Sequence, residues 1–230
     1  MFDVVIVPQG AESKAVAKAI AQTTANPKLV KIPIGTQNTT ATLEQQKFWQ
    51  ESPKKVLMLG LCGSLSPDLA VGEAVLYQSC QNLTTKAQLT LQPELNSAIQ
   101  QKLALKLVNG LTSDRIITTV SEKQQLAQKY HCEAIDMENY AYLKFLQEQQ
   151  IQLAIIRVIS DDLTFDLPDL NSAIAPTGQI KPLAMTTALL QNPLNSTRFV
   201  KNSLQALKQL EKITYQIFNQ LPTTNHLTPA

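Results

Sequence analysis

Acidic side chains stand just beyond short apolar runs at three places in this sequence. Glu12 follows the first such run, Glu138 closes the segment EAIDME, and Asp161 follows the run LAIIRVIS. In α/β proteins the carboxyl ends of strands carry many catalytic groups, because these ends open into a crevice. A carboxylate there can bind sugar hydroxyls or orient water, and a protonated carboxyl can donate a proton. Glu138 and Asp161 are therefore a candidate acidic pair.

Each of these acids also has an ordinary structural explanation. A glutamate in the first turn of a helix, as expected for Glu12 and Glu138, is favoured by the helix dipole. An aspartate after a strand often caps the next element through its side chain. A cap needs only one acid, whereas Asp161 and Asp162 are adjacent. If Glu138 and Asp161 lie close together, each carboxylate raises the pKa of the other, so that one can stay protonated while the other is ionised.

No other residue pattern in the sequence is typical of a catalytic centre. Cys62 is interpreted as a small buried hydrophobe, because its neighbours are apolar and no histidine is near it. The two histidines, His131 and His226, form no cluster with metal-ligand spacing, so no metal is expected. Phosphate-loop and GxGxxG fingerprints are absent. The small-residue stretch from Gly60 to Ser64 is expected to be a loop that lets backbone approach a ligand closely.

The composition indicates one domain that binds small molecules. The 230 residues can bury a full core and contain no long Gly/Pro/Ser-rich linker, so we expect a domain over residues 1–221 and a frayed tail over 222–230. The net charge of +2 includes no run of like charge and gives no footprint of nucleic acid or an anionic membrane. No apolar stretch is long enough for a transmembrane segment. Three cysteines without CxxC spacing, and no signal peptide, indicate a cytoplasmic protein.

Strand-like and helix-like segments alternate along the chain. Extended segments are expected at 4–7, 29–34, 56–59, 74–79, 104–107, 115–120 and 153–159, with a hairpin or loop at 81–91. Helices are expected at about 12–24 and 41–51, after an N-cap at Ser121, after the DME motif, and at about 183–191 and 196–220. This alternation predicts an α/β fold, with a mixed or parallel sheet and helices on both faces.

Three motifs, taken in order, resemble a known family. VLMLGLCGSLSPDLAVGEAVL, EAIDMENYAYL and IIRVISDD are similar to the glycine loop, the ribose motif and the acid motif of the nucleoside phosphorylase and nucleosidase superfamily, over most of the chain. TSDRIITTVSEKQQLAQKYHCEAIDMEN and PTGQIKPLAMTTALLQNP further resemble the hopanoid-biosynthesis-associated phosphorylase branch, which is thought to remove adenine from an adenosyl-lipid. The resemblance implies a three-layer α/β/α fold with a central mixed sheet, and a homo-oligomer.

The resemblance also implies roles for the residues of the acidic motifs. Asp161 matches the acid that protonates N7 of the leaving purine, and Ser160 would support it. Glu138 matches the carboxylate that holds the ribose 2′ and 3′ hydroxyls, with Met137 packing under the sugar. A protonated acid and a preorganised carboxylate suit a reaction that leaves positive charge on the sugar and negative charge on the base.

Further positions complete the implied site. The backbone near Cys62 and Gly63 would border the ligand, and Ile117 falls where the family reads the base through main chain. Glu12 approximates the water-activating glutamate of the hydrolytic members. The implied activity is cleavage of the N-ribosidic bond of a purine nucleoside or adenosyl-linked substrate, with phosphate as a possible co-substrate and no other cofactor.

The sequence departs from the family pattern at the phosphate and base positions. Met58 and Leu61 occupy the places of an arginine and a serine that bind phosphate in hexameric phosphorylases, and neither side chain can hydrogen-bond an oxyanion. Ile116 replaces the aromatic residue that commonly stacks on the base. Arg115 and Arg157 are candidate substitutes for the anion ligands. Hydrolysis and phosphorolysis both stay open, and the alternative is a catalytically silent relative that binds nucleosides or serves in assembly.

Overall fold

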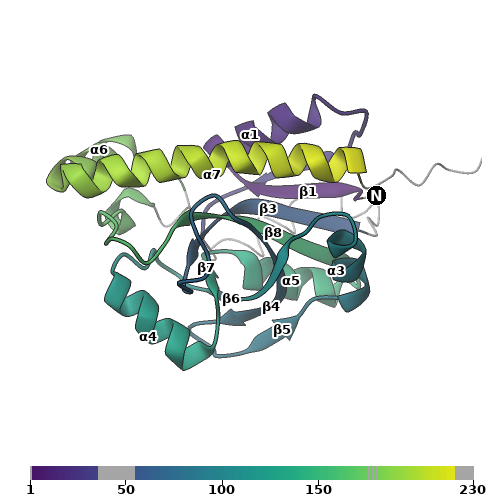
Figure 1. Ribbon diagram of the computed structural model, residues 1–230, viewed down its shortest axis with the longest axis horizontal. Helices are drawn as coiled ribbons and strands as arrows, with labels where there is room; N and C mark the ends of the chain where they lie inside the picture. Colours follow the sequence, from purple (N-terminus) through teal and green to yellow (C-terminus); the bar gives the residue numbers. More distant parts are fainter. Residues whose placement is uncertain (1, 36–54, 176, 178, 180, 221–230) are drawn as a thin grey trace, which may run out of the picture.

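The chain folds around one mixed β-sheet with helices on both faces, as Figure 1 shows. The computed structural model describes residues 2–35, 55–175, 177, 179 and 181–220. The predicted helix at 41–51 and the predicted tail at 222–230 lie outside the described residues. The α/β class and the central mixed sheet are confirmed. Within the described residues, no helix is long and apolar enough to cross a bilayer.

Eight strands form the sheet in the described part of the chain. Their bounds are β1 (Val4–Pro8), β2 (Lys28–Ile32), β3 (Lys55–Ser64), β4 (Ala74–Asn82), β5 (Gln88–Thr90), β6 (Lys106–Thr112), β7 (Ala134–Asp136) and β8 (Gln152–Asp161). The order is β2-β1-β3-β7-β6-β4-β5, and β8 pairs with both β3 and β4. The strands β3, β8, β4, β6 and β7 therefore close into a ring. At the carboxyl end of β3, Gly63 pairs with Ile135 of β7 and with Asp161 of β8, which brings the two acidic motifs together.

Helices cover both faces of this sheet. Their bounds are α1 (Ala11–Ile20), α3 (Pro93–Gln100), α4 (Val120–Tyr130), α5 (Asn139–Glu148), α6 (Pro182–Gln191) and α7 (Pro193–Gln220), with a 3₁₀ turn η2 (Asn171–Ala173). Apolar residues of α1, α3 and α7 share one core cluster with β1, β3 and β8, whereas those of α5 belong to a second cluster on the opposite face. Consecutive residues of β3 and β8 alternate between the two clusters, as expected for strands buried on both sides.

Several local predictions were wrong. The stretch from Gly60 to Ser64 is no loop, because β3 continues to Ser64. Helix α4 begins at Val120, and its N-cap is Thr119 rather than Ser121, since the Thr119 side chain accepts a hydrogen bond of 3.3 Å from the Glu122 N–H. Residues 115–119 are not a strand, and α3 (Pro93–Gln100) was not predicted. The hairpin at 81–91 is confirmed by the antiparallel pairing of β4 with β5.

The glycines of β3 make room for side chains of β8. Gly60 pairs with Arg157, and a Cβ atom at Gly60 would lie 2.0 Å from Arg157 Nη1. After a register shift between Cys62 and Gly63, Gly63 pairs with Asp161, and its Cβ would lie 2.8 Å from Asp161 Oδ2. Both distances are shorter than atoms can approach. These two positions therefore require glycine because neighbouring polar side chains occupy the space.

The crowding at Gly60 predicts a loss of stability in Gly60→Ala. The added methyl group overpacks a buried site and should lower the free energy of unfolding by about 1–3 kcal/mol, measured by urea denaturation. Because the clash is with the Arg157 guanidinium, the double variant Gly60→Ala/Arg157→Gln should lose less stability than the two single variants combined. Strictly additive losses would contradict a direct clash.

Candidate active site

All eight residues that the sequence analysis assigned to a site line one cavity. Its volume is about 230 Å³, and it lies where the carboxyl ends of β3, β7 and β8 meet the start of α1. The lining is mostly apolar. The eight residues are Glu12, Cys62, Gly63, Ile117, Met137, Glu138, Ser160 and Asp161. The structure thus brings together groups that are far apart in the sequence, while their individual roles stay predictions.

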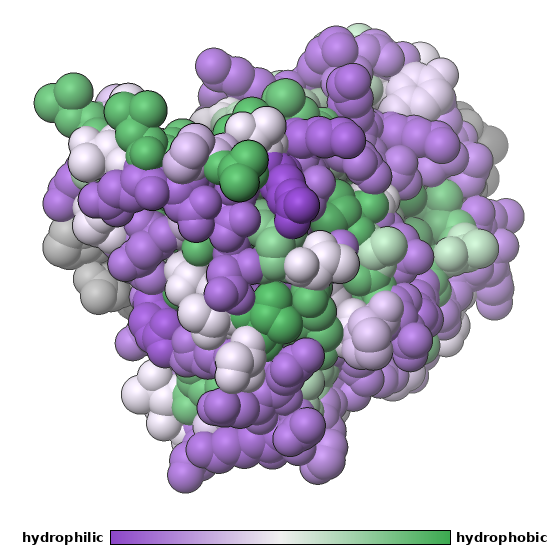
Figure 2. All heavy atoms as spheres, turned by 60° about the vertical axis from the view of Figure 1, so that its left-hand side comes forward, coloured by the Kyte–Doolittle hydropathy of each residue, from purple (hydrophilic) through white to green (hydrophobic). Residues whose placement is uncertain are grey.

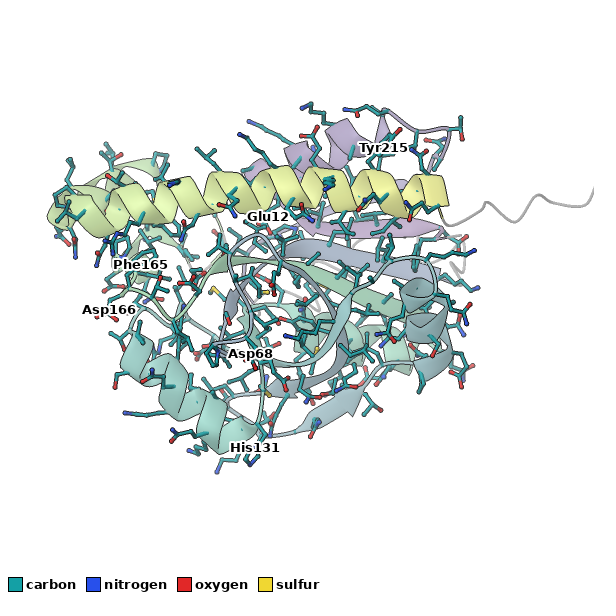
Figure 3. All side chains as sticks on the ribbon, viewed as in Figure 1. Glu12, Asp68, His131, Phe165, Asp166 and Tyr215 are labelled. Carbon is teal, nitrogen blue, oxygen red and sulfur yellow. The ribbon has the colours of Figure 1, made fainter. Side chains whose placement is uncertain are left out.

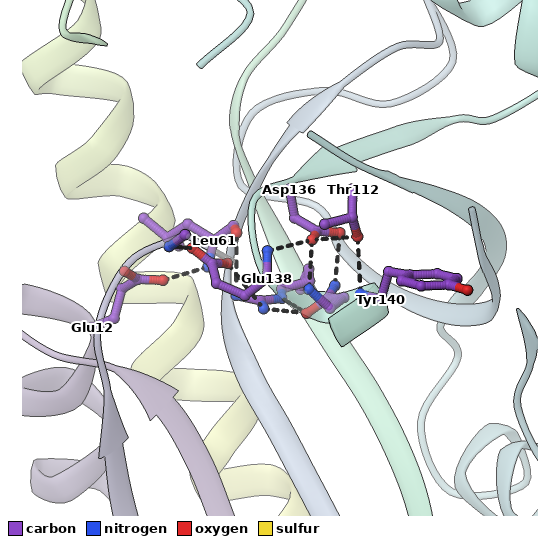
Figure 4. A network of polar contacts seen from close by, with 9 residues as sticks. Glu12, Leu61, Thr112, Asp136, Glu138 and Tyr140 are labelled. Carbon is purple, nitrogen blue, oxygen red and sulfur yellow. Dashed lines mark hydrogen bonds and ion pairs between the residues drawn. The ribbon is translucent and has the colours of Figure 1, made fainter. Parts of the chain in front are cut away.

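Asp136 organises the turn that presents Glu138 (Figure 4). Its carboxylate accepts hydrogen bonds from the Thr112 hydroxyl at 3.0 Å, from the Glu138 N–H at 3.0 Å, and from both the backbone and the side chain of Asn139 at 2.8 Å. Thr112 in turn accepts the Tyr140 N–H at 3.0 Å. A carboxylate with this many donors stabilises the helix start through charge-assisted bonds. The first acid of the DME motif is therefore structural, and it fixes the direction of the third.

Glu138 is a buried carboxylate held at both oxygens. Oε1 accepts the Gly35 N–H at 3.1 Å, and Oε2 lies 3.5 Å from Nη2 of Arg157. Burial raises the pKa of Glu138, Arg157 opposes this shift, and the charge of Asp136 adds to it. Glu138 thus reaches the cavity with its orientation fixed by a backbone donor and a guanidinium. Such a preorganised carboxylate suits a polar ligand with two adjacent donors.

Arg157 is the charge that holds the acidic side of the cavity together. Its side chain is completely buried, and it donates to Asn139 Oδ1 from two nitrogens and to the Leu61 carbonyl at 3.4 Å. Burial opposes its charge, but the carboxylates of Glu138, Asp136 and Glu12 together raise its pKa. Arg157 does not line the cavity. It is therefore a poor substitute for a missing phosphate ligand, because its donors already serve protein groups.

The donors of Arg115 are also already used by a protein group. It lines the cavity, but its guanidinium forms an ion pair and two hydrogen bonds with Glu122 on α4. Ile116 and Ile117 follow it on the cavity wall, and Asn171 fixes this segment by binding the Ile116 N–H at 2.8 Å and its carbonyl at 3.2 Å. This wall of the cavity is thus aliphatic at Ile116 and Ile117.

Glu12 reaches the cavity from the first turn of α1. Its Oε1 accepts the Leu61 N–H at 2.7 Å. Burial raises the pKa of Glu12 to about 7, although Arg157 opposes the shift, and Glu138 adds to it. A carboxyl that titrates near neutral pH is suited to accept a proton from water. The second oxygen of Glu12 forms no described hydrogen bond, in contrast to Oε1.

Asp161 lies at the end of β8 with a partner at each oxygen. Oδ1 is 2.9 Å from the Ser160 hydroxyl, which also lies 3.1 Å from the Cys62 carbonyl. Oδ2 forms an ion pair with Lys123 of α4. Asp162 has a different arrangement, because its side chain binds the Thr164 N–H at 3.0 Å. Of the two adjacent acids, only Asp161 lines the cavity.

Lys123 was not predicted as a site residue, and the acids interact differently from the expectation. The Lys123 side chain is 1% exposed. The helical repeat could have indicated it, since Lys123 lies three residues before the buried Leu126. Glu138 and Asp161 were expected to raise each other's pKa. Glu138 interacts instead with Arg157, Asp136 and Glu12, and Asp161 pairs with a cation.

The cysteines and His131 contribute no described reactive group to the cavity. Burial raises the pKa of Cys62, which agrees with its interpretation as a small hydrophobe. Cys62, Cys80 and Cys132 are free and buried. His131 is the C-cap of α4 in a left-handed conformation, and Figure 3 shows it at the end of that helix, well away from Glu12. The chemistry available at the cavity is therefore that of carboxyl groups, one hydroxyl, the guanidinium of Arg115 that is paired with Glu122, and the buried cations behind the acids.

Comparison with solved structures shows the same fold in three nucleosidase-type proteins. A Borrelia burgdorferi protein named for 5′-methylthioadenosine/S-adenosylhomocysteine nucleosidase activity, bound to adenine, superposes with a TM-score of 0.65 at 14% identity, covering 94% of this chain and 99% of that one. A mutant of the Helicobacter pylori nucleosidase with 5′-methylthioadenosine in the active site has a TM-score of 0.60 at 16% identity, with 89% of this chain and 98% of that one covered. Helicobacter pylori futalosine hydrolase has a TM-score of 0.60 at 16% identity, with 87% of this chain and 96% of that one covered.

Sequence comparison identifies the family. No curated protein matches the chain. The sequence model of the Phosphorylase superfamily matches residues 7–190, which include every residue that the sequence analysis assigned to the site. The chain belongs to the Phosphorylase superfamily.

Proposed function

We propose that this protein cleaves the N-ribosidic bond of an adenine nucleoside and releases the base. The observation that carries the proposal is the convergence of Asp161, Glu138 and Glu12 on one mostly apolar cavity. Adenine and 5′-methylthioadenosine are bound in two of the structures with the same fold, which supports a ligand of this class. Membership of the Phosphorylase superfamily supports the assignment of the N-ribosidic bond as the bond that is cleaved.

The three acids divide the work of bond cleavage. As the bond from C1′ to N9 breaks, its electron pair moves to the purine, and Asp161 donates a proton to N7. Glu138 accepts hydrogen bonds from the ribose 2′ and 3′ hydroxyls and places negative charge near the developing ribosyl cation. Met137 packs under the sugar, and Ile116 and Ile117 contact the base. General acid catalysis of this kind contributes about 10²- to 10⁴-fold to the rate.

Water is the nucleophile that the charges of the cavity favour. The described lining contains four acids, Glu12, Asp136, Glu138 and Asp161, and Arg115 is its described basic residue. Arg115 is paired with Glu122. A phosphate ion would meet this excess of negative charge, whereas Glu12 can orient a neutral water molecule. We therefore propose hydrolysis, with phosphate kept as a possible co-substrate and no metal or organic cofactor.

The substrate that we propose carries an apolar group at its 5′ position, as the resemblance to the hopanoid-associated branch implies. Ile34, Ile174 and Met185 contribute apolar surface to the cavity wall. Leu183, Leu190 and Leu194, on or next to α6, are 85%, 74% and 79% exposed. Figure 2, which brings the α6 side of the molecule forward, shows hydrophobic side chains on this face among mostly hydrophilic ones. An apolar 5′ chain that extends from the cavity toward α6 would contact these exposed leucines.

Assembly and location complete the proposal. We propose a homo-oligomer, because large exposed leucines on one side of a protein are typical of a surface that another chain covers. Free, buried cysteines support a reducing, cytoplasmic location. Light scattering coupled to size exclusion measures the oligomeric state, and a monomer at micromolar concentration would overturn that part.

The choice of nucleophile is tested by adenine release from 5′-methylthioadenosine and adenosine, with and without phosphate. Chromatography should show adenine and free sugar in phosphate-free buffer, and added phosphate should not accelerate the reaction. Release that depends on phosphate would make the protein a phosphorylase. Tight binding of a ribo-oxocarbenium mimic without any release of base would favour the catalytically silent alternative.

Asp161→Asn removes the proposed acid. Because an amide cannot donate the required proton, adenine release should fall by about 10²- to 10⁴-fold, measured at a temperature at which the variant is folded. The matched control is Asp162→Asn, which changes the adjacent acid that binds Thr164 and does not line the cavity. Equal losses in the two variants would contradict a specific role for Asp161.

The role of Glu12 predicts a pH dependence. Only the ionised carboxylate can accept a proton from water, and burial raises the Glu12 pKa to about 7. The rate should therefore rise with pH, about tenfold per unit below pH 7, and level off above it. Glu12→Gln should remove this rise and slow hydrolysis, whereas Glu94→Gln, an exposed acid in the first turn of α3, should leave the profile unchanged. A flat wild-type profile between pH 5 and 7 would refute the assignment.

An apolar 5′ site predicts a preference for longer alkyl chains. Between 5′-methylthio- and 5′-butylthioadenosine, kcat/KM should increase by up to roughly fourfold per added methylene group, since each buried methylene contributes about 0.8 kcal/mol. Met185→Asp should reduce this preference more than it reduces the cleavage of adenosine. A fall in kcat/KM with chain length would exclude an apolar 5′ site.

A further inference from the structure

Lys123 is a buried cation to which the proposed reaction gives no role. Its ammonium group contacts Asp161 Oδ2 and lies 3.3 Å from the Asp162 carbonyl oxygen. The helix that carries it is fixed at its start, because the Thr119 side chain caps α4 and Asp166 Oδ1 accepts the Val120 N–H at 2.7 Å. Lys123 is therefore held against Asp161 by a rigid element.

Stability alone explains this ion pair poorly. The Lys123 side chain is 1% exposed and that of Asp161 is 10% exposed, so both charges lose most of their hydration. The cost of removing such charges from water often exceeds their mutual attraction, and an apolar pair of similar volume would be at least as stable. A buried ammonium group beside a cavity acid has a chemical use instead, since it carries a proton that it can release.

The contacts of Asp161 allow its carboxyl group to receive and hold that proton. Lys123 donates to Oδ2, while Oδ1 faces Ser160. The single hydroxyl proton of Ser160 can serve either Oδ1 or the Cys62 carbonyl, which lie 2.9 and 3.1 Å away. When it serves the carbonyl, which can only accept, Ser160 can accept a proton from Oδ1. The carboxyl group can therefore be bound both as a carboxylate and as an acid.

We propose that Lys123 supplies the proton that Asp161 delivers to the leaving base, an inference that rests on the function proposed above. As the glycosidic bond breaks, the N–H bond of the ammonium group breaks and an O–H bond forms on Asp161. The carboxyl proton then forms the N7–H bond of the purine, whose ring takes up the electron pair of the broken bond. Lys123 is left as a neutral amine, and after adenine leaves, water in the open cavity returns a proton through Asp161.

Lys123 acts through Asp161 and is thus a positioning residue and proton source rather than a group that touches the substrate. Asp161 lines the cavity, whereas Lys123 lies behind it. Its contribution should therefore depend on how much the leaving group needs a proton. Purines leave poorly as anions, but 4-nitrophenolate is a stable anion and needs no proton. A role in protein stability would affect both leaving groups alike.

The test compares 5′-methylthioadenosine with 4-nitrophenyl β-D-ribofuranoside in Lys123→Met, Lys123→Arg and the control Lys129→Met, an exposed lysine on the same helix. Lys123→Met should lower kcat for the nucleoside by about 10²-fold or more, with KM within about threefold, and should change the nitrophenyl riboside rate by less than about threefold. Lys123→Arg keeps the charge but does not release its proton, so it should be as slow as Lys123→Met.

The outcomes separate this inference from the proposed function. Equal losses with both leaving groups, or recovery of the nucleoside rate in Lys123→Arg, would overturn the proton role while wild-type cleavage still supports the function. If the wild-type protein releases no adenine, the function and the inference both fail. Where the wild-type protein cleaves only the nucleoside, the inference is decided by kcat against KM and by the arginine variant.

Discussion

The pairing of β3 with β8 is the interaction on which the rest of the structure depends. These two central strands pair in parallel over nine residues of β3, and their register places a glycine opposite Arg157 and another opposite Asp161. Gly60 leaves space for Arg157, and Gly63 leaves space for Asp161. A shift of one residue would point each of these side chains to the other face of the sheet. The single irregularity, between Cys62 and Gly63, brings Asp161 into line with the second glycine.

The acids of the site lie against two buried cations. Arg157 offsets Glu138, Asp136 and Glu12, and Lys123 offsets Asp161. An unpaired buried charge is expensive, so each carboxylate requires its cation before it can be held in a mostly apolar cavity. The two groups are supplied by different elements, β8 for the arginine and α4 for the lysine. This separation places Glu138 and Asp161 against different cations.

Much of this arrangement could be predicted from the sequence, and the failures have physical causes. The apolar runs of β1, β7 and β8 and the acids at their ends have local signatures, which is why Glu12, Glu138 and Asp161 were found. The loop predicted at Gly60–Ser64 was wrong because glycine can either permit a turn or leave space for a neighbouring side chain. Here the stretch is a strand, and its glycines leave space for side chains of β8. The helical repeat can indicate that Lys123 is buried, but it cannot indicate that the partner of Lys123 lies 38 residues away. Tertiary pairing of this kind is visible only once α4 is placed against β8.

The crowding of β3 also affects how such a protein can evolve. Gly60 and Gly63 admit no larger side chain without displacing Arg157 or Asp161, so this end of the cavity tolerates few substitutions. Ile174, which follows η2, and Met185, on α6, also line the cavity but lie outside the ring of strands. The crowding at the two glycines therefore does not restrict these positions. New substrate preferences can therefore arise by exchange of residues at the outer wall while the acids stay in place. One fold can in this way acquire different substrate specificities while it keeps the same acidic residues.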